Sequence, residues 1–268
     1  MQLFDLTGEV AVVIGATGAL GGAIASGLAR AGAHVAVLGR NADRGNERVK
    51  AIRAAGGVAE FIACDAHRSE ALTQAEVAIE SAVGAPTILV NAAGGNDPKA
   101  TVTPERPFEK LALADIEANL DLNFVAGALL PCQVFGPGLC RRKKGSIITI
   151  ASVSAHLPLS RVGIYSAAKA AVLNLSQFLA REWAPHGVRV NTITPGFFPA
   201  EQNRRLLFNE DGSPTARAQS ILGHTPMKRF GDPEELVGAA VFLASAKAAG
   251  FVTGSDIQVD GGFLCQTI

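Results

Sequence analysis

Two hydrophobic patterns alternate along this chain. Short β-branched and aliphatic runs, such as VAVVI before Gly15, are followed by longer Ala-rich stretches whose apolar residues recur at helical spacing. The short runs predict strands at residues 10–15, 34–39, 58–64, 87–94, 146–152, 188–196 and 255–262. The longer stretches predict helices at residues 20–32, 41–55 and 69–83, a long helix that carries Asn123 and ends near residue 144, and helices at 165–183 and 233–245.

Strand–helix alternation of this kind predicts an α/β fold. We expect a single-domain, Rossmann-type, doubly wound parallel sheet of about seven strands, with helices on both faces and right-handed crossovers. No change of composition marks a linker, so residues 1–268 are interpreted as one dinucleotide-binding catalytic domain. Its substrate-binding segment is expected at about residues 197–230. Pro131 falls inside the long helix and should bend it.

Composition removes several classes of function. A formal net charge of zero argues against a nucleic acid or an anionic membrane as the partner. The N-terminus does not have the pattern of a signal peptide, and no run of about 18 apolar residues is found that would span a bilayer. We therefore expect a cytoplasmic protein. The four cysteines show no metal-binding spacing and are expected to be buried, reduced thiols; they are Cys64, Cys132, Cys140 and Cys265.

Catalytic chemistry is indicated by three residues. Ser152 ends an apolar run, while Tyr165 and Lys169 are four residues apart on a predicted helix and so project from one face. A tyrosine, whose ordinary pKa is about 10, becomes a better base beside a cation. The serine hydroxyl can hold a substrate oxygen while the tyrosine transfers a proton.

A dinucleotide site is indicated by the first strand–helix turn, IGATGALGG. Its glycines let backbone amides approach a pyrophosphate. Asp65 ends the third strand, where it could accept a hydrogen bond from an adenine amine. After the second strand, Arg40 stands where an NAD site would have an acidic residue, so NADP is favoured over NAD.

Two further features concern access and assembly. Residues 95–107 are interpreted either as a loop over the mouth of the site or as a surface insertion. The helix that carries Tyr165 is apolar around its circumference, and burial against a second subunit would explain this. We therefore expect a homo-oligomer.

Together these motifs resemble the short-chain dehydrogenase/reductase family over essentially the whole chain. The resemblance implies that Ser152 orients a carbonyl, Tyr165 is the acid/base, Lys169 binds the nicotinamide ribose and lowers the pKa of the tyrosine, and Asn123 holds a water of a proton relay. It also implies a tetramer. The cofactor-binding residues that we expect are Gly15, Thr17, Gly18, Leu20, Gly21, Arg40, Asn41, Asp65, Asn91, Ala92, Ala93, Gly94, Tyr165, Lys169, Pro195 and Gly196.

The chain departs from the family pattern at three positions. Ile14 replaces a threonine, Ala19 replaces a turn glycine, and Ala200 stands where a threonine often touches the nicotinamide amide. These departures affect the shape of the turn and one cofactor contact.

Within the family, the chain looks closest to fructuronate reductases, also described as D-mannonate oxidoreductases, in three segments: residues 91–101, 195–213 and 224–236. This resemblance implies a sugar-acid substrate, whose carboxylate would suit an arginine. The substrate-binding candidates are Asn96, His156, Arg161, Gln202, Arg204 and Arg205. The alternatives are a 3-oxoacyl or general ketone or sugar reductase of the same fold, and a catalytically inactive cofactor-binding regulator. No metal is expected.

Overall fold

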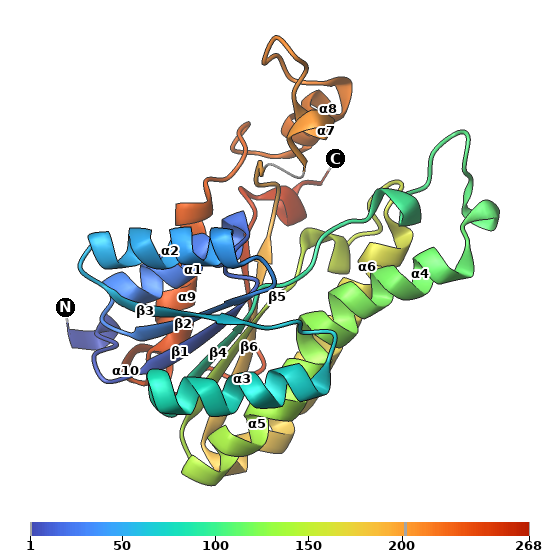
Figure 1. The fold of residues 1–268 in the computed structure, drawn as a ribbon. Coiled ribbons are helices and arrows are strands. Elements are labelled where there is room, and N and C mark those ends of the chain that lie inside the picture. Colours follow the sequence, from blue (N-terminus) through green and yellow to red (C-terminus); the bar gives the residue numbers. More distant parts are fainter. Residues whose placement is uncertain (1, 201–202, 268) are drawn as a thin grey trace.

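Seven parallel strands form the centre of the structure, a computed structural model that describes residues 2–200 and 203–267. The order across the sheet is β3-β2-β1-β4-β5-β6-β7 (Figure 1). The chain therefore reverses its direction of winding between β1 and β4, and the predicted doubly wound sheet is confirmed. The strands are β1 (Val10–Ile14), β2 (His34–Gly39), β3 (Val58–Ala63), β4 (Ile88–Asn91), β5 (Gly145–Ile150), β6 (Val188–Pro195) and β7 (Asp256–Val259).

Helices cover both faces of this sheet (Figure 1). Because successive strand residues point to opposite faces, Val13 belongs to one core and Val12 to the other. The first core lies under α1 (Ala19–Arg30), α2 (Ala42–Ala54) and α9 (Val237–Ala244). The second lies under α3 (Ser69–Ala82), α5 (Leu130–Arg142) and α6 (Gly163–Trp183).

The long predicted helix changes its type along its length. It begins as α4 (Leu113–Leu120), widens into a π-helical segment (Asp121–Leu129), and continues as α5. Proline has no N–H to donate, and the π-helical segment ends just before Pro131. The change from π-helix to α-helix thus falls next to Pro131, while the bend expected there stays a prediction.

This helical run, Leu113–Arg142, is long and apolar enough to cross a membrane by length and composition. The helix contains no uninterrupted run of about 18 apolar residues; it meets the criterion because its polar residues leave the mean hydropathy high. More than half of its apolar window (56%) is buried inside the protein. The run packs against α3 and α6, as the core helix of a globular fold does.

Two short helices form an arm above the carboxyl ends of the strands (Figure 1). They are α7 (Arg204–Leu207) and α8 (Ala216–His224), and neither was expected from the sequence. Leu207, Ala218 and Ile221 form a small core of their own within this arm. A capping box joins Asp232 and Glu235 at the start of the turn before α9, and α10 (Ala246–Ala249) follows α9. Single 3-10 turns occupy Gln2–Phe4, Pro98–Ala100, Phe108–Lys110, Val153–Ala155, Ala184–His186, Pro233–Leu236 and Phe263–Cys265.

All four cysteines are free thiols. Cys64 and Cys132 are buried, and burial raises the pKa of Cys132 to about 12 and that of Cys64 to about 11. These thiols stay protonated near neutral pH. Cys140 is only partly buried and Cys265 is exposed, so the prediction of burial is wrong for these two.

Candidate active site

Ser152, Tyr165 and Lys169 come together beyond the carboxyl end of β5. Ser152 begins the 3-10 turn Val153–Ala155, and its Oγ accepts a hydrogen bond from the Ser154 amide at 3.2 Å. The Ser152 side chain lies within interaction range of the phenol of Tyr165, whose pKa it lowers, and Tyr165 lies in the first turn of α6. Lys169 follows one turn later, with Nζ 5.8 Å from the centre of the Tyr165 ring. The structure thus brings together the three residues that the sequence spacing indicates.

Burial controls the ionisation of this group. Lys169 is 4% exposed, its Nζ donates to the Ile150 carbonyl oxygen at 2.8 Å, and desolvation lowers its pKa to about 8. Burial also raises the pKa of the Tyr165 phenol, and the Ser152 side chain offsets only part of that rise. The expectation that Lys169 holds the pKa of Tyr165 below its ordinary value is therefore wrong here. Desolvation of the phenol is the larger effect.

Asn123 connects the long helix to the turn after β4. Its side chain is fully buried within the π-helical segment, a helix type often found at functional sites. Asn123 Nδ2 donates to the Gly95 carbonyl oxygen at 2.9 Å, and Oδ1 accepts from the Gly95 amide at 2.9 Å. A Cβ at Gly94 would lie 2.8 Å from Asn123 Oδ1 and 3.4 Å from Lys169 Nζ. Gly94 therefore lies directly beside both side chains.

The glycine-rich turn lies against the turn that follows β4. Gly15 has φ +82°, and a Cβ there would lie 2.6 Å from the Ala93 amide nitrogen. Gly18 begins α1 without any side-chain cap, and Gly18 and Ala19 are exposed. The backbone amides of this first turn are therefore available to an anion, and a cofactor pyrophosphate fits here.

Other cofactor candidates surround this turn. A Cβ at Gly39 would lie 2.7 Å from Thr17 Cγ2, so the turn rests on the end of β2. Arg40 is exposed immediately after that strand. Asn41 caps α2 by accepting a hydrogen bond from the Arg44 amide at 2.9 Å, so its side chain has a structural role.

Asp65 and Asn91 behave differently from each other. Asp65 follows β3 and is half-buried, and its Oδ1 accepts from the His67 amide at 3.2 Å. Asn91 is buried, and its amide donates to Thr149 Oγ1 at 3.1 Å, across from β4 to β5. Asn91 therefore stabilises the sheet beneath the turn, while Ala92 and Ala93 are partly exposed.

The Pro195–Gly196 turn packs on the chain end. A Cβ at Gly196 would lie 2.7 Å from Asp260 Cα, which explains why glycine stands opposite the VDGG segment. Farther along, the Ala200 amide donates to Asn203 Oδ1 at 2.7 Å, within its own loop.

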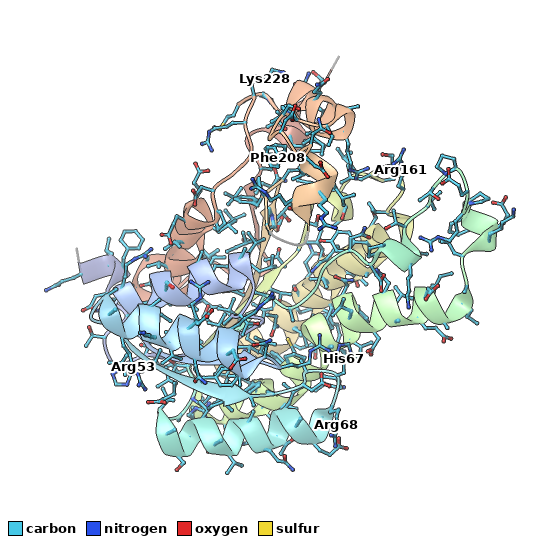
Figure 2. The ribbon with its side chains drawn as sticks, turned by 45° about the horizontal axis from the view of Figure 1, so that its top comes forward. Arg53, His67, Arg68, Arg161, Phe208 and Lys228 are labelled. Carbon is cyan, nitrogen blue, oxygen red and sulfur yellow. The ribbon has the colours of Figure 1, made fainter. Side chains whose placement is uncertain are left out.

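The three arginine candidates for substrate binding lie in different parts of the structure. Arg161 is exposed before α6 with φ +71°, a backbone conformation that is rare for a residue other than glycine, and its carbonyl oxygen accepts from the Val102 amide at 2.8 Å (Figure 2). Arg204 lies 5.6 Å from the ring centre of Phe208 in the arm. Arg205 is exposed.

The uncharged candidates are mostly engaged elsewhere. Asn96 donates to Thr101 Oγ1 at 2.8 Å within its own loop. His156 Nε2 lies 3.1 Å from Asp256 Oδ2. Gln202 lies outside the described residues. Neither Asn96 nor His156 therefore presents a free hydrogen-bonding side chain in the way expected of a substrate contact.

One further residue, near Arg161, was not predicted from the sequence. Arg217 is half-buried on α8, and its pKa is lowered first by burial and then by the positive charge of Arg161. The two guanidinium groups therefore lie close enough to repel each other. Arg217 stands in a short polar segment without a periodic pattern, so no motif indicated it.

Comparisons with known proteins agree with this geometry. The family model described as enoyl-(acyl carrier protein) reductase matches residues 15–264. An uncharacterized oxidoreductase, UxuB of Bacillus subtilis, is 42% identical over 98% of this chain and 97% of its own length.

Two solved structures are also similar. One is a candidate D-mannonate oxidoreductase from Haemophilus influenzae with bound NAD, with a TM-score of 0.92 and 38% identity over 98% of this chain and 97% of that one. The other is a candidate NAD(P)-dependent gluconate 5-dehydrogenase from Beutenbergia cavernae with bound NADP at low occupancy, with a TM-score of 0.87 and 36% identity over 98% of this chain and 100% of that one.

Proposed function

This chain belongs to the short-chain dehydrogenase/reductase family and is an NAD(P)-dependent oxidoreductase, and we propose that it interconverts a keto and a hydroxy group of a sugar acid. The observation that carries the proposal is the grouping of the Ser152 side chain with the Tyr165 phenol, with Lys169 Nζ 5.8 Å from the centre of the Tyr165 ring. A half-buried phenol beside a hydroxyl is the arrangement that proton transfer at a substrate oxygen needs.

The cofactor would be held by the amides at the start of α1, by Asp65 and by Lys169, and its nicotinamide would accept or donate the hydride. The chain's own residues manage the proton. Ser152 holds the substrate oxygen, and Tyr165 donates its proton to that oxygen during reduction or accepts it during oxidation. We further propose that Asn123 and Lys169 resupply that proton from solvent.

A preference for NADP is supported by Arg40. It is exposed directly after β2, where a 2′-phosphate would lie in this kind of site. A planar guanidinium can hold a phosphate through two parallel hydrogen bonds.

A sugar-acid substrate is supported by the pair Arg161 and Arg217. Their mutual repulsion would be relieved by an anion between them, and a carboxylate matches the guanidinium geometry. The pKa of the exposed Glu105 carboxyl is lowered first by hydrogen bonds to its own backbone and to Thr103, and only last by the charge of Arg161. The substrate-binding segment would then be residues 197–230, together with the loop before α6.

Self-association is supported by the outer face of α6. Ala167, Ala170 and Phe178 are exposed there, and Phe178 keeps 55% of its surface in contact with solvent. We propose a homotetramer in the cytoplasm, formed in part through this apolar face.

The test of the activity is a panel of 5-keto and 3-keto sugar acids, neutral keto sugars and an acetoacetyl thioester, each followed at the nicotinamide absorbance. Turnover of keto sugar acids with little turnover of the thioester is expected. Preference for the thioester would favour a 3-oxoacyl reductase. Cofactor binding without any turnover would favour a regulator.

A further inference from the structure

We infer that His156 is a positioning residue that holds the Ser152 turn against the ends of β6 and β7 through Asp256. The inference rests on the role of Ser152 proposed above. It gives His156 a function other than contact with substrate.

His156 belongs to the same small turn as Ser152. The Ser152 carbonyl oxygen accepts from the Ala155 amide at 2.9 Å, and the His156 amide donates to the Val153 carbonyl oxygen at 3.1 Å. His156 therefore closes the 3-10 turn that Ser152 opens. The imidazole is thus connected to Ser152 through a single hydrogen-bonded turn of backbone.

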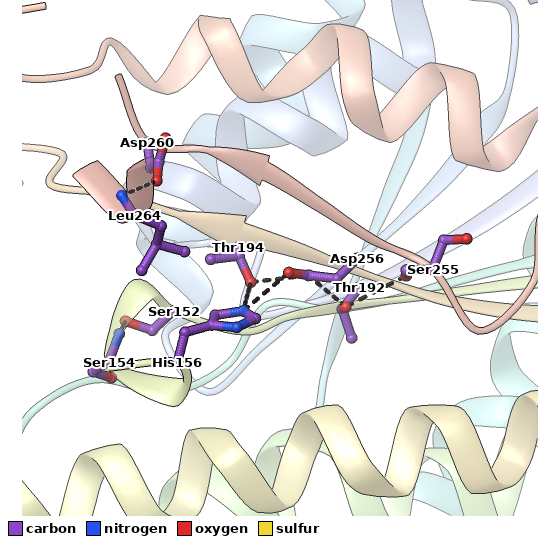
Figure 3. Close-up of polar contacts among 9 residues, drawn as sticks. All are labelled: Ser152, Ser154, His156, Thr192, Thr194, Ser255, Asp256, Asp260 and Leu264. Carbon is purple, nitrogen blue, oxygen red and sulfur yellow. Dashed lines mark hydrogen bonds and ion pairs between the residues drawn. The ribbon is translucent and has the colours of Figure 1, made fainter. Parts of the chain in front are cut away.

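The imidazole reaches across to a fixed carboxylate (Figure 3). Asp256 lies opposite Thr192 in the register of β6 and β7, and Thr194 is two residues farther along the same face. Asp256 Oδ1 accepts from Thr192 Oγ1 at 2.6 Å and from Thr194 Oγ1 at 2.8 Å. These bonds leave Oδ2 for His156, whose Nε2 is 3.1 Å away.

The position of the proton follows from this arrangement. The Asp256 carboxylate can only accept, so His156 Nε2 must carry the hydrogen. Thr194 Oγ1 lies 3.4 Å from Nε2 and can share that hydrogen, because its own hydrogen is directed to Asp256. The imidazole is thus held in one tautomer and one orientation.

The contact between His156 and Asp256 is partly shielded from solvent. The His156 side chain is 30% exposed and the Asp256 side chain is 20% exposed, although His156 as a residue is exposed. A hydrogen bond with a charged partner is stronger than a neutral one. The pair therefore connects two segments 100 residues apart in sequence, the serine turn and the edge strand β7.

If His156 positions Ser152, replacement of His156 should slow the chemical step of the reaction. A misplacement of about 1 Å in a catalytic group can lower a rate about a hundredfold. The test compares His156→Asn, whose amide is too short to reach Asp256, with His156→Gln, whose amide nitrogen can replace Nε2. The His156→Asn variant is expected to have a kcat lowered about tenfold or more and an unchanged KM for NAD(P). Its isotope effect with C4-deuterated nicotinamide should be larger. The His156→Gln variant should retain the wild-type kcat within about threefold.

Further variants separate the possible outcomes. Asp256→Ala should cause the same loss as His156→Asn, and the double variant should lose no more than either single one. Should His156→Asn not fold, the comparison of Asp256→Ala with His156→Gln decides. Equal activity of the Asn and Gln variants, or losses that multiply, would overturn the inference. Ser152→Ala is measured alongside: if it keeps full turnover, the proposed role of Ser152 fails, whereas its loss together with an active His156→Asn removes only the positioning role.

Discussion

Lys169 Nζ lies 5.8 Å from the centre of the Tyr165 ring and donates its hydrogen bond to Ile150. The ammonium is therefore close to the phenol without being bonded to it. Lys169 is buried and Tyr165 is half-buried, and desolvation opposes the charged form of each: it lowers the pKa of Lys169 and raises that of Tyr165. The neutral phenol is thus the favoured resting form, which suits a proton donor.

Tyr165→Phe removes the proposed acid and base without removing the ring. We expect kcat to fall about a thousandfold, because general acid–base catalysis typically contributes that much. Cofactor affinity, measured by fluorescence titration, should change little. Substantial remaining turnover would exclude Tyr165 from proton transfer.

The raised pKa of Tyr165 also predicts different pH profiles for the two directions. Ketone reduction needs the protonated phenol, which persists to higher pH when its pKa is raised, so the reduction rate should stay level through neutral pH. Alcohol oxidation needs the phenolate, so its rate should rise with pH well into the alkaline range. Measurement of kcat/KM in both directions checks this, and an oxidation optimum below neutral pH would contradict it.

Lys169→Met should abolish activity and yet stabilise the fold. The gap between a folded pKa of about 8 and the ordinary 10.5 corresponds to about 3 kcal/mol, and the lost hydrogen bond to Ile150 offsets about 1 kcal/mol. Below pH 8 the lysine is charged in both states, and the folded state carries the full penalty. The penalty falls between pH 8 and 10.5, since the folded protein releases its proton first.

Urea unfolding at neutral pH and near pH 10 measures this effect. The Met variant should be about 1–3 kcal/mol more stable at neutral pH, and its advantage should shrink as pH rises. Lys50→Met, on the exposed face of α2, serves as the control and should show little effect at either pH. An advantage that grows with pH would contradict burial as the cause.

Most of the sheet could be predicted from sequence because buried parallel strands are continuous apolar runs. β2 has the predicted bounds, and the other strands differ by a few residues at their ends. The arm helices α7 and α8 could not be predicted, because they are short and polar. Their stability comes from contacts such as the edge-to-face pair Phe208 and Phe230, which only the fold creates.

The same distinction applies to the site. Ser152, Tyr165 and Lys169 could be predicted because their spacing is local. The pair of His156 and Asp256 could not, because nothing in the sequence relates residues so far apart. The direction of the Tyr165 pKa was also predicted wrongly, since it depends on burial by the whole fold.

Arg40→Asp should change the choice of cofactor. Loss of a guanidinium–phosphate contact should weaken NADP binding about tenfold or more, while NAD binding should change less than about threefold. Isothermal titration with each cofactor measures both. Lys50→Asp makes the same charge change on the exposed face of α2 and should leave the NADP-to-NAD ratio unaltered. Equal losses for both cofactors would show that Arg40 does not contact the 2′-phosphate.

Arg217→Gln tests the proposed carboxylate site. Removal of one guanidinium from the Arg161–Arg217 pair should lower kcat/KM for a keto sugar acid about tenfold or more, because a charged hydrogen bond to the carboxylate is lost. Arg161→Gln should have the same effect, and the corresponding neutral keto sugar should be turned over equally well by the wild type and both variants.

Arg205→Gln tests the alternative carboxylate contact in the arm, since Arg205 is a substrate candidate exposed on α7. An unchanged kcat/KM in this variant, beside losses at Arg161 and Arg217, would locate the carboxylate between α8 and the loop before α6. The opposite result, with a loss confined to Arg205→Gln, would move the carboxylate to α7. In that case Arg161 and Arg217 would repel each other without binding the substrate carboxylate, and the pair would have no role in substrate recognition.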